Sequence, residues 1–301
     1  MKKIKENYDF TDETANNLLC KINTYMNNQT ATFEKYIIYK MYLECIDPDV
    51  MSYQLQEIYK KKWNEKYLKS CKKTEDSVFS DTMTSVQGLL HSYYDSELSN
   101  KNEKIKSEIK KYKEEKNLKL FSFSKKTMFT MFTEIKKYPE FERTIVRKNE
   151  VNDFISRYHT IGNYIPVPQY FNKNRGSKGI GKGWKNYDMW DLTLLKIIEY
   201  YDLKKENKDA VNILMQLLHC KNKNSDIIAS TKNWLDCYEN KKEFIDKNYL
   251  NMYVDKNYNI KNDFRKIHTW ENPEPIDHIK YFKMISEAID ERAKLILKEE
   301  K

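Results

Sequence analysis

The side chains best suited to acid–base chemistry occur close together, between residues 157 and 191. The imidazole of His159 titrates near neutral pH, so it can act as a general base or as a proton donor. The carboxylates of Asp188 and Asp191 could share that role, and these three residues are the candidate catalytic residues. Asp191 also stands where a helix is expected to begin, so a helix N-cap is its structural alternative.

A second group of side chains in and beside this stretch could bind a ligand. Asparagine amides can fix a polar ligand or hold a turn, and an arginine can bind an anion through two parallel hydrogen bonds. Lysine adds positive charge, and indole rings can stack on nucleic-acid bases. The candidate binding residues are Asn163, Asn172, Arg175, Lys182, Trp184 and Trp190.

Glycine and proline are concentrated around these candidates. Five of the six glycines and two of the six prolines fall between residues 162 and 183. Such residues allow backbone conformations that others avoid, so the stretch is expected to form either a functional loop or a structural strand and turn. The basic part, residues 173–185, is a candidate for contact with phosphate.

The segment Gly176–Gly183 resembles the phosphate-binding loop G-x-x-x-x-G-K-[ST], but Gly183 replaces the hydroxyl residue that binds magnesium. No apolar strand runs into Gly176. The sequence therefore does not support a magnesium–nucleotide loop of that type.

No metal site is predicted and no cofactor is identified. The five cysteines lie far apart without a C-x-x-C pair, and the histidines do not form an H-x-x-x-H or H-E-x-x-H pattern. The cysteines are expected to be reduced thiols.

The elements that must position these residues are expected to be helices. Six glycines and six prolines in 301 residues favour long helices over many short strands. The predicted fold is mainly α, a multi-helix globular protein with a few short strands near 120–125 and 161–168. Apolar spacing predicts helices over 51–68, 76–94, 188–219 and 276–297. The lysine- and glutamate-rich run 101–118 has few apolar residues and is expected to be a solvated helix with i,i+4 ion pairs.

We expect two lobes: an N-terminal helical lobe at 1–118, and a C-terminal helical lobe at 119–301 that carries the Gly/Pro-rich loop 157–191. The formal net charge is +9, from 54 basic and 45 acidic residues, and it is spread over both halves. That charge permits contact with nucleic acid without requiring it. With no long apolar run and no secretory signal, a cytoplasmic protein without a membrane partner is expected.

Several segments resemble a family of bacterial proteins of unknown function. The shared motifs are Asp81-Thr-Met-Thr-Ser, Thr160-Ile-Gly-Asn with the following prolines, Phe171-Asn-Lys-Asn-Arg-Gly and Trp190-Asp-Leu-Thr-Leu-Leu. Trp270-Glu-Asn-Pro and Ile289-Asp-Glu-Arg are similar to the end of that family. The resemblance implies a bacterial or phage setting and no particular activity.

A fainter similarity links Ile161-Gly162-Asn163 and Asn172 to HNH-type nuclease domains of restriction systems. The histidine motif that should precede them has no counterpart, because no histidine occurs between His91 and His159.

Whether the chain is an enzyme stays open. The first hypothesis is a protein of bacterial–phage conflict, acting in defence or counter-defence, that contacts nucleic acid or nucleotide through residues 173–190. The alternatives are a small-molecule or nucleotide-processing enzyme that uses His159 with Asp188 and Asp191, and a non-catalytic inhibitor that binds another protein.

Overall fold

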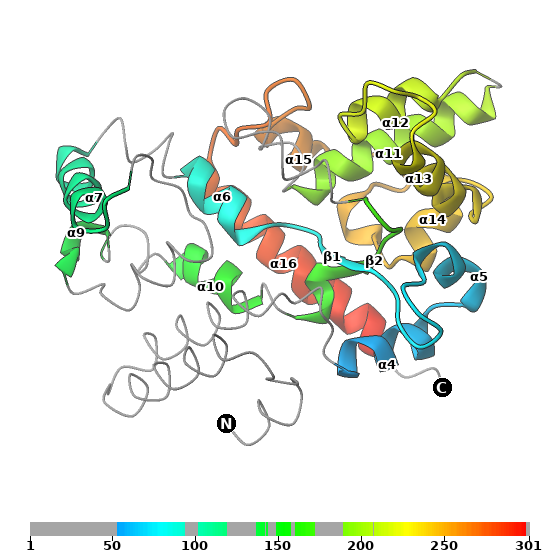
Figure 1. Cartoon of the computed structure of the whole chain (residues 1–301), viewed down its shortest axis with the longest axis horizontal. Helices are drawn as coiled ribbons and strands as arrows, with labels where there is room; N and C mark the ends of the chain where they lie inside the picture. The colour runs from blue at the N-terminus through cyan, green and yellow to red at the C-terminus, as the bar shows by residue number, and fades with distance from the viewer. Residues whose placement is uncertain are drawn as a thin grey trace. The chain divides into compact units, whose positions relative to one another are not determined.

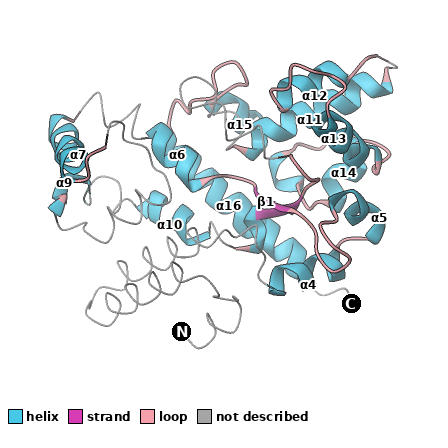
Figure 2. Cartoon of the chain, in the orientation of Figure 1, coloured by secondary structure: helices cyan, strands magenta, loops and turns pink. Residues whose placement is uncertain are grey.

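The computed structural model of the chain describes residues 53–93, 102–118, 137–141, 143, 149–157, 160–171, 189–206 and 208–298. In these ranges the chain is mainly helical and has one two-stranded sheet, which confirms the predicted fold class (Figures 1 and 2). Among the described helices, none combines the length and apolar character needed to cross a membrane.

The described residues form two compact units, and each unit draws on separated parts of the chain. The first unit takes described residues from Val86–His159 and His278–Ser286, together with Tyr53. The second takes them from Gln54–Ser85, Thr160–Asp277 and the segment after Ser286. The expected division into lobes 1–118 and 119–301 stays a prediction.

The first unit consists of helices whose buried faces are largely aromatic. The centroid of the Phe282 ring lies 5.9 Å from that of Tyr93 and 5.5 Å from that of Phe154. The ring centroids of Tyr112 and Tyr138 are 5.7 Å apart. The helices are α6 (Val86–Tyr93), α7 (Glu103–Glu115), α9 (Pro139–Phe141), α10 (Asn149–Arg157) and the first part of α16 (His278–Leu297).

Two expected helices can be compared with this unit. The lysine- and glutamate-rich run 101–118 forms α7, capped by the Asn102 side chain, which accepts hydrogen bonds from two backbone amides of the first turn. The helix expected over 76–94 is shorter, because Ser80–Thr82 pairs as a strand and the helix begins only at Val86.

The second unit contains the sheet and most of the helices. Its elements are α4 (Tyr53–Lys62), α5 (Glu65–Leu68), η2 (Lys69–Cys71), β1 (Ser80–Thr82), η6 (Ile161–Asn163), β2 (Tyr164–Pro166), α11 (Trp190–Lys205), α12 (Val211–Leu217), α13 (Asp226–Asp236), α14 (Lys241–Lys247), η7 (Asn251–Tyr253), α15 (Asn262–Ile267) and the remainder of α16.

Strands β1 and β2 pair antiparallel, with Asp81 opposite Ile165. The strand expected near 161–168 is thereby confirmed as β2, and the one expected near 120–125 lies outside the described residues. The β1–β2 pair brings together the Asp81 and Thr160 motifs, which are about eighty positions apart in the sequence.

Arg292 fixes the backbone of this segment from α16. Its Nη1 donates to the carbonyl oxygens of Tyr164 at 2.7 Å and Gly162 at 3.0 Å, and its Nε donates to Asn248 at 3.1 Å. Arg292 is completely buried, and no carboxylate of the described residues pairs with it. Burial lowers the pKa of Arg292 to about 10, although nearby tyrosines, Tyr59 foremost, act in the opposite direction.

An aromatic cluster fills the core of the second unit. Trp234 lies edge-on to Phe244 and to Phe171, with ring centroids 5.3 Å apart in both pairs. The Phe171 ring also packs against Trp190, with ring centroids 6.3 Å apart. Because Trp190 begins α11, this packing fixes the position of the first turn of that helix.

Candidate ligand-binding site

The first turn of α11 carries a buried carboxylate. The N-cap of α11 is Met189, in an extended conformation, and Asp191 follows in the first turn. The aspartate side chain is 1% exposed, and its Oδ2 accepts a hydrogen bond from His268 Nε2 at 2.5 Å. A negative charge at this end of a helix is also stabilised by the helix dipole.

The ring of His268 has an acceptor at each nitrogen. Besides the bond to Asp191, Nδ1 lies 3.1 Å from the carbonyl oxygen of Pro273, so it donates there. A ring that donates from both nitrogens carries both protons, so an acceptor at each nitrogen favours the charged form of His268. Burial alone lowers the pKa of His268, but the charge and hydrogen bond of Asp191 and the carbonyl of Pro273 outweigh it and raise that pKa above its usual value.

A tight turn follows His268 and positions two more side chains. The Thr269 amide donates to the carbonyl of Asn272 at 3.0 Å, and the Asn272 amide donates to the Thr269 hydroxyl at 3.1 Å. Trp270 and Glu271 are the two central residues of this turn. Because both ends of the turn are hydrogen-bonded, the two side chains extend from a fixed backbone.

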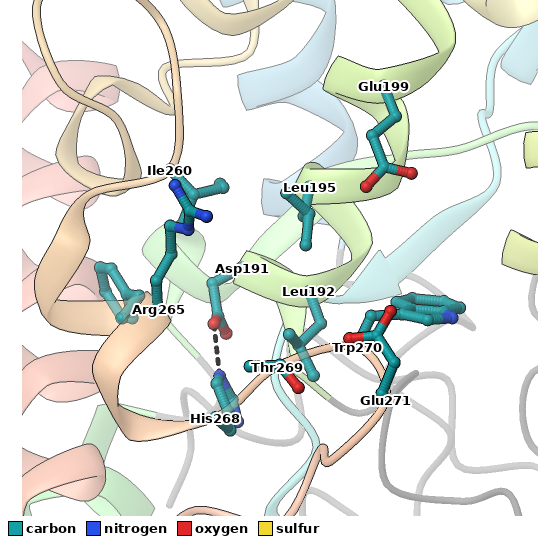
Figure 3. Close-up of a pocket in the computed structure, with 11 residues that line it drawn as sticks. Asp191, Leu192, Leu195, Glu199, Ile260, Arg265, His268, Thr269, Trp270 and Glu271 are labelled. Carbon is teal, nitrogen blue, oxygen red and sulfur yellow. Dashed lines mark hydrogen bonds and ion pairs between the residues drawn. The ribbon is translucent and has the colours of Figure 1, made fainter.

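A cavity of about 230 Å³ lies between α11, α15 and this turn (Figure 3). On α11 the lining residues Asp191, Leu195 and Glu199 are four positions apart and Leu192 is three positions before Leu195, which places them on one face of the helix. Asp191 and His268 are the buried polar members of the lining, and the apolar ones are Leu192, Leu195, Ile260 and Phe264. The remaining lining residues are Glu199, Arg265, Thr269, Trp270 and Glu271.

Lys196 forms an ion pair with Glu199, one of the carboxylates that line the cavity. Its Nζ lies 2.7 Å from Glu199 Oε2 and 5.1 Å from the centre of the Trp270 ring, and the side chain is 8% exposed. This ion pair and cation–π contact hold Trp270 against α11. Arg265 and Glu271 are exposed, and neither forms an ion pair within the described part of the chain.

Three of the sequence-predicted site residues can be placed. Asp191 lines the cavity, and Trp190 beside it is completely buried. Asn163 lies elsewhere, with 0% exposure; its Oδ1 accepts from the Thr84 amide at 3.0 Å and its Nδ2 donates to the Thr84 carbonyl at 3.1 Å. The others lie outside the described residues: His159, Asn172, Arg175, Lys182, Trp184 and Asp188.

The residues that line the cavity with Asp191 were not predicted from the sequence. His268, Arg265 and the Trp270 turn are more than seventy positions further along the chain. One signal was present, since Trp270-Glu-Asn-Pro was among the family-like motifs and begins two positions after His268. No group of three or more histidine, cysteine or acidic side chains suited to a metal ion occurs in the ranges that the structure describes.

Comparison of the chain with protein-family models, curated proteins and solved structures gave no match. The resemblance to a bacterial family therefore stays a prediction, and the function proposed below rests on the geometry of the site.

Proposed function

We propose that this protein binds a small polar molecule in the cavity between α11, α15 and the Trp270 turn. The observation that carries the proposal is a cavity that combines a buried Asp191–His268 ion pair with an indole and two exposed charges, Arg265 and Glu271, that form no ion pair with any described residue. Ligand pockets commonly have this composition: an apolar wall and a few converging polar groups.

The site supports binding better than acid–base catalysis. Each nitrogen of His268 already donates to a protein oxygen, so the ring can reach a substrate proton only after one of those bonds breaks. The stable charge pair is better suited to hold the α15 turn against α11 and to present a fixed polar surface. Its role in this proposal is to position the site.

A thermal-shift screen tests the proposal. Nucleosides, nucleoside monophosphates, amino acids and small carboxylic acids are added separately to the full-length chain. We expect at least one compound to raise Tm by roughly 5 °C at about 100 times its Kd.

The matched variants are Leu195→Trp, which places an indole in the cavity, and Leu295→Trp, which places the same group on the exposed side of α16. We expect the first variant to abolish the shift and the second to keep it. A shift that survives in Leu195→Trp, or no shift with any compound, would overturn the proposal.

The hypotheses drawn from the sequence stand beside this proposal. A cytoplasmic protein of bacterial–phage conflict that contacts nucleic acid through residues 173–190 stays a prediction, and so does an inhibitor that binds another protein. Of the three residues in the enzyme hypothesis, only Asp191 lies within the described residues. In the present proposal it positions the site.

A further inference from the structure

The charges around the cavity indicate which chemical class of ligand it accepts. We infer that the ligand is dipolar, with an oxyanion that binds Arg265 and an N–H donor that binds Glu271. This inference rests on the proposed function. A flat or apolar body between the two ends would lie along the wall formed by Leu192 and Leu195 and beside Trp270.

Two of the carboxylates that line the cavity already form ion pairs within the protein. Asp191 is neutralised by His268 at 2.5 Å, and Glu199 is neutralised by Lys196 at 2.7 Å. Breaking either pair to bind a ligand would leave a largely buried charge without a partner, which is strongly unfavourable. Recognition of a charged ligand is therefore expected from the remaining lining charges.

Those remaining charges are one cation and one anion. Arg265 and Glu271 line the cavity, and neither has an ion-pair partner in the described ranges. In Figure 3 the guanidinium of Arg265 and the carboxylate of Glu271 lie on different sides of the Asp191–His268 pair. A simple anion would satisfy Arg265 but face repulsion from Glu271, and a simple cation would meet the reverse. A ligand with both ends satisfies both residues.

The chemistry at each end is specific. A guanidinium binds a carboxylate or a phosphate through two parallel hydrogen bonds. A glutamate carboxylate accepts hydrogen bonds from an ammonium group or from an exocyclic amino group. Trp270, next to Glu271, supplies an aromatic surface close to that end. Two sources share this chemistry: a nucleoside monophosphate with an amino-bearing base, and an aromatic amino acid.

Calorimetric titration of the full-length chain separates the two sources. Adenosine monophosphate is compared with adenosine, which lacks the phosphate, and tyrosine is compared with tyramine, which lacks the carboxylate. We expect one of the two complete molecules to bind, and its truncated form to bind on the order of 10- to 100-fold more weakly.

Arg265→Gln should weaken the complete ligand by a similar factor and leave the truncated form unchanged. Glu271→Gln should weaken both forms, because both keep the amino group. The matched control is Lys266→Gln, which removes the neighbouring exposed charge on α15 and should leave both affinities unchanged.

The outcomes separate this inference from the proposal beneath it. Binding of either complete molecule with the stated dependence on Arg265 and Glu271 supports the inference and identifies the source. If neither molecule binds, or if Arg265→Gln binds both forms as the wild type does, the inference is overturned. The proposed function would still stand if another compound gave a shift that Leu195→Trp removes.

Discussion

Gly162 packs directly against the backbone of α16. A Cβ atom at this position would lie 2.0 Å from the carbonyl oxygen of Ile289. Because backbone cannot move aside as a flexible side chain can, we expect Gly162→Ala to lower the free energy of unfolding by about 3 kcal/mol. Urea unfolding followed by circular dichroism measures the loss.

The control for this substitution is Ile276→Ala, at a residue that is 77% exposed, and we expect it to change stability by no more than about 0.5 kcal/mol. Equal urea midpoints for Gly162→Ala and the wild type would show that α16 does not approach the Thr160 motif as closely as described.

The Asp191–His268 pair makes stability depend on pH. The pKa of His268 is raised in the folded state, so the folded chain holds this proton more tightly than the unfolded chain does. The resulting stabilisation is fully present below about pH 6.5, the usual value for histidine, and is lost as pH rises through the higher folded pKa. Tm measured from about pH 5.5 to about pH 9 should therefore fall more steeply in the wild type than in His268→Gln.

Asp191→Asn provides the second arm of that experiment, because it removes the charge that raises the pKa of His268. Its Tm profile should also be flatter than that of the wild type. Parallel profiles for all three proteins would mean that the pair does not titrate in this range.

At the scale of elements, Arg292 joins α16 to the segment around β2. Arg292→Met keeps an apolar chain of similar length and removes the Arg292 hydrogen bonds to the carbonyls of Gly162, Tyr164 and Asn248. The buried carbonyl oxygens then lack this donor, which destabilises the folded chain, whereas the desolvation penalty of the cation disappears, which offsets part of the loss. We expect the free energy of unfolding to fall by about 3 kcal/mol.

Arg292→Lys distinguishes hydrogen-bond geometry from charge. An ammonium group cannot reproduce the planar fork that serves several carbonyls, so this variant should also be destabilised, by about 2 kcal/mol. Urea unfolding provides both values. Wild-type stability in Arg292→Lys would mean that positive charge alone is sufficient there.

The elements were partly predictable from the sequence. The helical content and β2 follow from the scarcity of glycine and from local patterns, and α7 follows from the i,i+4 ion pairs of its lysine- and glutamate-rich run. Strand β1 was not predicted: three residues are too short for a period-two pattern, and only their partner strand defines them.

The candidate site was less predictable than the fold. Asp191 was selected because a carboxylate before an apolar helix is visible locally. Its partner His268 was not selected, because the contact spans 77 positions and no local motif marks it. The roles of Asn163 and Arg292 were hidden for the same reason. Each satisfies backbone groups that become neighbours only in the folded chain.

At the scale of the whole molecule, both the Arg292 contacts and the ligand cavity belong to the second unit. The residues that line the cavity all lie in one stretch of that unit, Thr160–Asp277, but on α11 and around α15, so the site is complete only when these two segments have folded together. The functional account therefore applies to the full chain, and each test uses it. The central claim is that a small ligand occupies the cavity beside Trp270.

Fluorine NMR of the chain labelled with 5-fluorotryptophan tests that claim most directly. The five tryptophans give separate probes, and Trp270→Phe assigns the one that lines the cavity. When the compound identified by the screen is added, we predict that the Trp270 resonance shifts in a saturable way while those of Trp63 and Trp234 stay in place. Saturable binding that leaves Trp270 unchanged and shifts another tryptophan would contradict the account.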